Sequence, residues 1–190
     1  KTHRCATILL IDEAYHLFTG ESMQSLCQEF ENIIIVRSFS KDIGMAGLRC
    51  GYLLSKPENI DFLYRVKPMY EVTEATVAFC MAVLEYPLHI KKYLADIEEG
   101  MTFLKESLHK MGIVTGGGNG NFIVINLGND CDLLQIIKGL KDRGVLIRRP
   151  FSVESIKGWL RIGVGNVPQM KRFVLELGEV LAEAGWHNTS

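Results

Sequence analysis

The first half of the chain alternates apolar runs with polar segments in an order that predicts strands separated by helices. Continuous apolar runs at 6–11 and 32–36 are typical of strands buried on both faces of a sheet. Between them, apolar residues at helical spacing predict a helix over 22–30, with Ser22 as its N-cap. A further strand is expected at 48–54. This strand–helix–strand order predicts an α/β fold with a mostly parallel sheet.

The middle of the chain is helical by the spacing of its apolar residues. Helices are expected at 57–64 and at 73–86, where the segment is apolar enough to be largely buried. A long amphipathic helix is expected at 88–111, where apolar residues recur every three or four positions. Pro87 marks a boundary between them, which predicts a first domain over 1–86 and a second over 87–190.

The second domain is expected to be a small α+β domain. The glycine-rich run at 116–120 reads as a flexible connection, because it lacks the lysine and hydroxyl residue of a phosphate-binding loop. The remaining apolar patterns predict strands at 121–126, 145–148 and 159–164, and helices at 132–143 and 168–184.

Composition favours an ordinary soluble, cytoplasmic globular protein and argues against several functions. The chain has 190 residues, 47% of them hydrophobic, and a formal net charge of −1. This balance gives no support for binding nucleic acid or an anionic membrane surface, and no apolar run approaches the roughly 20 residues that span a bilayer. The five scattered cysteines predict buried thiols rather than disulfides, and neither they nor the histidines have metal-ligand spacing.

Three polar stretches follow apolar strands, where an α/β sheet presents its ligand site. Their residue types are those that pyridoxal 5′-phosphate (PLP) chemistry requires: an amine for a Schiff base, a carboxylate for the pyridine nitrogen, a donor for the phenolic oxygen, and an anion cradle for the phosphate. The candidates are, in chain order, Asp12, Tyr15, Ser38, Ser40, Lys41, Arg49, Arg148 and Arg161.

Three motifs carry a resemblance to a known family. The string SFSKDIGMAGLRCGY, which begins at Ser38, resembles the cofactor-lysine motif of the class I and II aminotransferases. The string IDEAY that ends at Tyr15 resembles their preceding Asp-x-x-Tyr motif, and WLRIGVG, which begins at Trp159, is similar to their C-terminal arginine segment. Their order and intervals resemble those of the histidinol-phosphate aminotransferase group, which also contains decarboxylases of phosphorylated amino acids.

The resemblance implies a role in cofactor binding for each residue of the first two motifs. Asp12 would pair with the pyridine nitrogen of PLP and Tyr15 with its phenolic oxygen. Lys41 would form the Schiff base and carry the proton during catalysis. The phosphate would be held by Ser38, Ser40 and Arg49.

Two arginines are expected to bind the anionic group of the substrate. Arg161 lies in an apolar strand, where a guanidinium must meet either a carboxylate of the protein or an anionic ligand, and the resemblance favours the ligand. Arg148 falls where the histidinol-phosphate group keeps a second arginine. Arg149 would point to the opposite face of the expected strand, and we expect it to be solvated.

The resemblance covers essentially the whole chain but only the second half of a family member. It implies a fold-type I enzyme, with 1–86 as the C-terminal portion of the PLP-binding large domain and 87–190 as the small domain. It also implies a homodimer in the full-length protein, with Lys67 or Tyr70 near the neighbouring subunit's site, although Glu71 replaces an expected small polar residue. We expect either a fragment or a truncated homologue that binds PLP weakly by itself.

The expected activity is the transfer of an amino group from a small amino acid or phosphorylated amine to a 2-oxo acid. Two alternatives stay open. A PLP-dependent decarboxylase of phosphorylated amino acids would use the same cofactor residues, and a non-catalytic sensing domain of a transcription regulator would keep the lysine without turnover.

Overall fold

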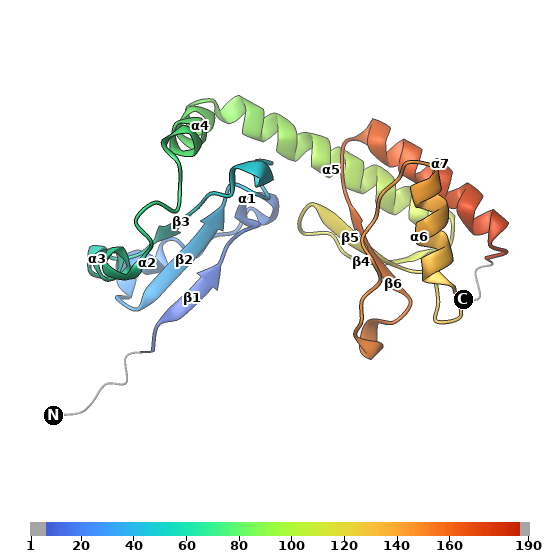
Figure 1. The fold of residues 1–190 in the computed structure, drawn as a ribbon, viewed down its shortest axis with the longest axis horizontal. Coiled ribbons are helices and arrows are strands. Elements are labelled where there is room, and N and C mark those ends of the chain that lie inside the picture. The colour runs from blue at the N-terminus through green and yellow to red at the C-terminus, as the bar shows by residue number, and fades with distance from the viewer. Residues whose placement is uncertain (1–6, 187–190) are drawn as a thin grey trace. The chain divides into compact units, whose positions relative to one another are not determined.

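The computed structural model describes residues 7–186 and divides the chain into two compact units, Lys1–Leu94 and Ala95–Ser190 (Figure 1). Each unit is built around a three-stranded sheet. Cys5 and Ala6, the latter the first residue of the first predicted strand, lie outside the described residues. Among residues 7–186, no helix combines the length and the apolar character needed to cross a membrane.

The sheet of the first unit has the order β1 (Leu9–Asp12), β2 (Ile33–Ser38), β3 (Gly51–Leu54). β1 runs parallel to β2, whereas β3 is antiparallel to it, so the sheet is mixed. The central strand β2 has its first three isoleucines buried, as its continuous apolar run predicts. The predicted strand at 32–36 is therefore confirmed, with its end shifted to Ser38.

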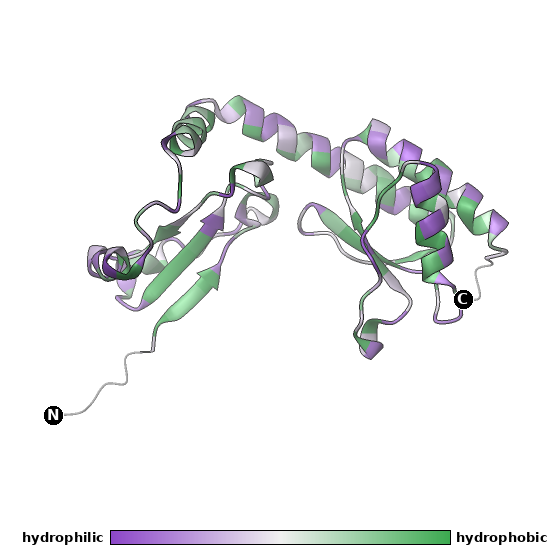
Figure 2. Ribbon diagram, in the orientation of Figure 1, coloured by the Kyte–Doolittle hydropathy of each residue, from purple (hydrophilic) through white to green (hydrophobic). Residues whose placement is uncertain are grey.

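β1 is more exposed than its sequence predicts. Leu9 is 51% exposed and Leu10 63% exposed, although Figure 2 shows the ribbon of this strand as hydrophobic. The prediction of burial on both faces is wrong for β1, because the described residues leave these leucine side chains largely uncovered. The strand also lies at the edge of its sheet, with β2 as its one strand partner among the described residues.

The short helices of the first unit differ most from the predictions. The helix expected over 22–30 is reduced to α2 (Leu26–Glu29), because the Ser22 hydroxyl bonds to the Glu13 carboxylate instead of capping a helix. α1 (His16–Thr19) and the 3₁₀ turn η1 (Ala46–Leu48) are not anticipated by any sequence pattern. Each is a single turn, too short to display a periodicity.

The longer helices form where their spacing predicts. α3 (Pro57–Val66) begins with a proline in its first turn, and α4 (Glu74–Glu85) is capped by the Thr73 side chain, which accepts a hydrogen bond from the Thr76 N–H. The expectation that α4 is largely buried is wrong, because Cys80 is its one buried residue. Cys27, Cys50 and Cys131 are free thiols but only half-buried, which corrects the prediction of buried thiols for these three.

The second unit packs helices against one face of an antiparallel sheet (Figure 1). The centre of the sheet is β5, and its inward residues Ile123 and Ile125 are fully buried with Leu160 of β6. The first helix of this unit is α5 (Pro87–Lys110), whose residues before Ala95 belong to the first unit. In chain order the other elements are β4 (Val114–Gly117), β5 (Phe122–Asn126), α6 (Leu133–Asp142), the 3₁₀ turn η2 (Glu154–Ile156), β6 (Trp159–Gly163) and α7 (Val167–Glu183).

Two predictions for the second unit are wrong. Gly116 and Gly117 belong to β4 and pair with β5, so only part of the glycine-rich run is a loop. Residues 145–148 form no strand. The chain turns after α6, where the Val145 N–H donates to the Leu140 carbonyl, and the segment then pairs with neither edge strand of the sheet, β4 or β6. Strand formation depends on a neighbour, which an apolar pattern alone does not supply.

Candidate functional site

The predicted cofactor residues of the first unit lie on two neighbouring turns. Asp12 ends β1, and Tyr15 follows it directly before α1. Ser38 ends β2, and Lys41 follows three residues later. Because β1 and β2 are parallel and Asp12 is opposite Val36, both turns lie at the carboxyl edge of the sheet, where α/β sheets bind ligands.

The lysine and the tyrosine are brought together at this edge. The Lys41 Nζ atom lies 5.9 Å from the centroid of the Tyr15 ring, and both residues are half-buried. Asp12 is exposed, and its Oδ1 atom accepts a hydrogen bond of 3.0 Å from the Ala14 N–H. This bond shapes the turn and uses one carboxylate oxygen, so the carboxylate retains acceptor capacity for a ligand.

The candidate phosphate residues follow β2. The Ser38 Oγ atom accepts a bond of 3.0 Å from the Ser40 N–H, which leaves the Ser38 hydroxyl hydrogen able to donate to an anion. Arg49 is exposed and donates from Nη1 to the Ala46 carbonyl at 3.0 Å. Arg49 also has φ 53, the one positive φ of a non-glycine residue among residues 7–186, a conformation that costs about 1–2 kcal/mol.

A buried ion pair that the sequence analysis missed stands behind these turns. The Arg37 Nη2 and Nε atoms lie 2.9 and 3.0 Å from Glu13 Oε2, and Nη2 also donates to the Ser22 hydroxyl at 2.8 Å. Burial raises the pKa of Glu13, but hydrogen bonds from the Met23 N–H, Arg37 and Ser22 outweigh it, so the pKa lies below its usual range. No sequence pattern indicates this pair, because Glu13 lies beside Arg37 only through the strand register, which pairs residue 12 with residue 36.

A second missed group lies next to the lysine. Asp42 is fully buried, its Oδ2 atom lies 2.8 Å from His16 Nδ1, and Oδ2 accepts a hydrogen bond from the Leu17 N–H at 3.2 Å. The same His16 Nδ1 atom lies at hydrogen-bonding distance, 3.1 Å, from the Glu13 carbonyl oxygen. The Tyr93 hydroxyl donates to the Lys41 carbonyl oxygen at 3.2 Å. No sequence pattern indicates a role for His16, because its partner is distant along the chain and neither residue has a recognisable spacing.

The two candidate substrate arginines belong to the second unit. The guanidinium carbon of Arg161 on β6 lies 3.8 Å from the centroid of the Phe122 ring, a cation–π contact on the face of the sheet opposite Leu160. Within residues 7–186, no carboxylate forms an ion pair with Arg161. Arg148 and Arg149 are both exposed, and because their segment is not a strand, the argument that they face opposite ways has no basis.

The segment predicted to approach a neighbouring subunit contains an ion pair and an exposed aromatic side chain. The Lys67 Nζ atom lies 2.7 Å from Glu71 Oε1, so the glutamate that departs from the family pattern forms an ion pair with the lysine. Tyr70 is 89% exposed.

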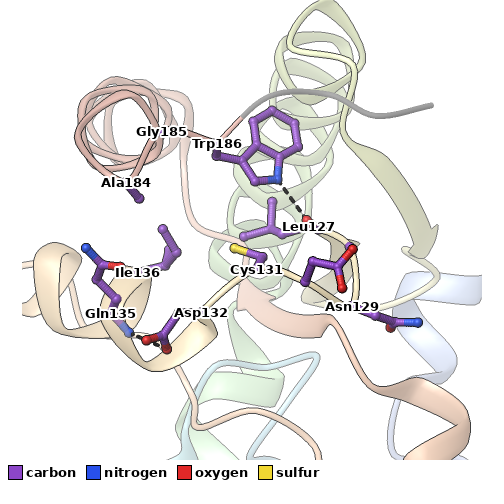
Figure 3. Close-up of a pocket in the computed structure, with 11 residues that line it drawn as sticks. Leu127, Asn129, Cys131, Asp132, Gln135, Ile136, Ala184, Gly185 and Trp186 are labelled. Carbon is purple, nitrogen blue, oxygen red and sulfur yellow. Dashed lines mark hydrogen bonds between the residues drawn. The ribbon is translucent and has the colours of Figure 1, made fainter.

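Two cavities among the described residues differ in whether predicted site residues line them. In the first unit, a cavity of about 320 Å³ is lined by residues that include Asp12, Glu13, Tyr15 and His16. In the second unit, a cavity of about 400 Å³ lies between the start of α6 and the end of α7 (Figure 3). There the Trp186 indole donates to the Leu127 carbonyl at 2.8 Å, and none of the predicted site residues lines it.

Comparisons with known proteins agree with the motifs. Residues 2–177 match the family described as "Aminotransferase class I and II". The histidinol-phosphate aminotransferase of Symbiobacterium thermophilum is 32% identical over 180 residues, which are 94% of this chain and 49% of that protein. The corresponding enzyme of Methanothermobacter thermautotrophicus is 30% identical over 178 residues, 92% of this chain and 48% of that protein.

A solved structure shows the same relationship in three dimensions. The histidinol-phosphate aminotransferase of Sinorhizobium meliloti, solved in complex with pyridoxal-5′-phosphate, superimposes with a TM-score of 0.83 at 25% identity. The superposition covers 93% of this chain and 49% of that one, so the chain spans about half the length of these relatives. With the family match over most of its residues, the chain belongs to the class I and II aminotransferases.

Proposed function

We propose that the full-length protein is a PLP-dependent aminotransferase, which moves an amino group between a small amino acid or phosphorylated amine and a 2-oxo acid. The observation that carries the proposal is the meeting of Lys41 and Tyr15 at the sheet edge that also presents Asp12. An amine, a phenol and a carboxylate at one edge are the groups that a pyridoxal ring needs from the protein. The family membership of the chain supports the same reading.

Each of these residues has a distinct task in the proposed reaction. The Lys41 amine would hold the cofactor covalently and would carry the proton that leaves the substrate α-carbon. Asp12 would hold the ring nitrogen protonated, and the Tyr15 hydroxyl would donate to the phenolic oxygen. When bound, PLP supplies the electron-withdrawing ring that makes this proton acidic.

The proposal assigns anion binding to two groups of residues. Ser38, Ser40 and Arg49 hold the cofactor phosphate, and the free Ser38 hydroxyl hydrogen and the exposed Arg49 guanidinium support that assignment. Arg161 and Arg148 bind the carboxylate or phosphate of the substrate. The absence of a carboxylate partner for Arg161 among the described residues leaves its charge available for a ligand.

The proposed organisation follows that of fold-type I enzymes. Residues 1–86 form the C-terminal portion of the PLP-binding large domain, and residues 87–190 form the small domain. A homodimer is supported by exposed apolar side chains of the first unit, among them Met69, Tyr70, Phe79 and Met81, which an aqueous surface does not favour.

Borohydride trapping tests the cofactor lysine. The full-length protein is incubated with PLP, reduced with borohydride and digested, and the pyridoxyl adduct is located by mass spectrometry. We expect the adduct on Lys41, its loss in Lys41→Ala, and its retention in Lys157→Ala, a control that removes a largely exposed lysine of the second unit. An adduct spread over surface lysines in both variants would contradict the proposal.

Product analysis then separates the reaction classes. We expect wild-type protein with an amino donor and a 2-oxo acid to give a new amino acid and a new 2-oxo acid in equal amounts. Carbon dioxide without a 2-oxo acid product would show a decarboxylase instead, and trapping at Lys41 without any product would show a sensing domain.

A further inference from the structure

Asp42, the residue that follows Lys41, is buried in a way that requires an explanation. Its side chain is 0% exposed, and its Oδ1 atom has no hydrogen-bond partner within residues 7–186. Burying a carboxyl group costs free energy unless donors replace water, so the contacts at Oδ2 must compensate. Both contacts come from α1, whose residues are about 25 positions away in the sequence.

These contacts tie together the two turns that carry the candidate cofactor residues. His16 follows Tyr15 in the chain, just as Asp42 follows Lys41. The contact of 2.8 Å between His16 Nδ1 and Asp42 Oδ2 and the hydrogen bond from the Leu17 N–H therefore join the turn of the tyrosine to the turn of the lysine.

The turn of the lysine is also held from α5. The Lys41 carbonyl accepts the Tyr93 hydroxyl and the Gly44 N–H, both at 3.2 Å. Gly44 has φ 77, and a Cβ atom there would come within 3.3 Å of the Tyr93 ring. With Tyr93 on its carbonyl and His16 on the next side chain, the backbone of Lys41 has little freedom to move.

We propose that His16 and Asp42 form a positioning pair that holds the Lys41 turn in register with the Tyr15 turn. The pair does not touch the reacting atoms; it sets where the lysine amine stands relative to the tyrosine ring, 5.9 Å away. The consequence for chemistry rests on the proposed function of Lys41, whereas the coupling between the turns does not.

Burial and charge agree with this arrangement. Burial raises the pKa of Asp42 above its usual value, and the opposing effects of the Leu17 N–H, His16 and Arg37 offset this only in part. A carboxyl group in these surroundings is stabilised chiefly by its two partners on α1, so the loss of His16 should loosen the Asp42 side of the contact.

The first measurement is amide hydrogen exchange without cofactor, in the full-length protein. We expect His16→Leu to speed exchange across 41–45, on the other turn, by about 10-fold, because the closed turn opens more often. The variant His16→Asn, whose amide nitrogen can occupy the place of Nδ1, should leave exchange near the wild-type rate. Unchanged exchange across 41–45 in His16→Leu would overturn the proposal, whatever the fate of the cofactor assignment.

The second measurement is the rate of PLP trapping on Lys41 by borohydride. We expect His16→Leu and Asp42→Ala each to slow trapping by about 10- to 100-fold, the scale of a misplacement near 1 Å, at temperatures where both are fully folded. The double variant should be no slower than either single one, and His16→Asn should restore most of the rate. If both folded variants trapped PLP at the wild-type rate, the pair would have no positioning role for Lys41, and the proposal would be overturned. If the wild-type protein itself trapped no PLP, that result would contradict the proposed function and not the coupling between the turns.

Discussion

The polar residues of the first unit fall into two layers around the sheet edge. Asp12 is exposed and Tyr15 and Lys41 are half-buried, whereas Glu13 and Arg37 form a buried ion pair. Asp12 and Glu13 are neighbours in the sequence but differ in exposure, because successive side chains at a strand end point to opposite sides. The buried pair is expected to stabilise the turns that carry the candidate cofactor residues.

Replacing the buried glutamate should weaken the fold in a pH-dependent way. The lowered pKa of Glu13 means that its carboxylate stabilises the folded state above the usual value of 4.5, and that this stabilisation is lost as the pH falls through the folded pKa. At pH 7, we expect Glu13→Gln to lower the free energy of unfolding by about 2 kcal/mol, because it removes charge-assisted hydrogen bonds. Urea unfolding at pH values from about 3 to about 7, across the range in which carboxylates titrate, measures this free energy.

The control for this prediction is Glu31→Gln, at an exposed glutamate of the same unit. That variant should unfold like the wild type at every pH. A gap between Glu13→Gln and the wild type that stayed constant as the pH fell would count against the carboxylate as its source.

At the scale of elements, close packing between α5 and the β6–α7 connection depends on one glycine. Gly100 of α5 is buried, and a Cβ atom there would overlap the Gly165 carbonyl oxygen. A helix normally gains stability when glycine is replaced by alanine, so the glycine is retained for the contact and not for the helix. Gly178 of α7 provides the contrast, since a Cβ atom there would meet only the Met111 methyl group at 3.9 Å.

The two glycines should therefore respond to alanine with opposite signs. We expect Gly100→Ala to lower the free energy of unfolding by about 2 kcal/mol, because the helix must move away from the connection. Gly178→Ala should raise it by up to about 1 kcal/mol through helix propensity. Denaturant unfolding of both variants measures the difference, and equal stability of the two would refute the packing argument.

At the scale of the whole molecule, the two units differ in how completely they bury their apolar residues. The second unit has a continuous core of fully buried residues, among them Leu104, Leu108, Ile136 and Leu177. Most of the large apolar side chains that remain exposed belong to the first unit. Since burial of apolar surface is the main source of stability, the second unit should be the more autonomous.

Separate expression of the two predicted domains tests this difference. We expect residues 87–190, which include all of α5, to unfold in one cooperative transition, and residues 1–86 to aggregate or unfold without one. Thermal unfolding followed by circular dichroism makes the comparison. A cooperative transition in residues 1–86 alone would show that their exposed apolar surface needs no cover.

The sequence by itself determined the positions of the long helices, which are local features, and the family, which short motifs identify. The periodicities of 88–111, 132–143 and 168–184 predicted α5, α6 and α7 nearly to the residue, because a helix repeats within its own segment. The motifs around Lys41 and Tyr15 identified the family and named the candidate site residues, whose roles remain proposals.

The tertiary structure alone decided which distant residues meet and which runs gain a strand neighbour. Nothing in a linear pattern pairs His16 with Asp42, because their contact depends on two turns meeting at one sheet edge. The apolar pattern of 145–148 was as strand-like as others, yet that segment pairs with no strand of the described residues. The leucines of β1 stay exposed because no other described element covers them. Strand pairing, burial and ion pairing are properties of neighbours in space, whereas helix periodicity is a property of neighbours in sequence.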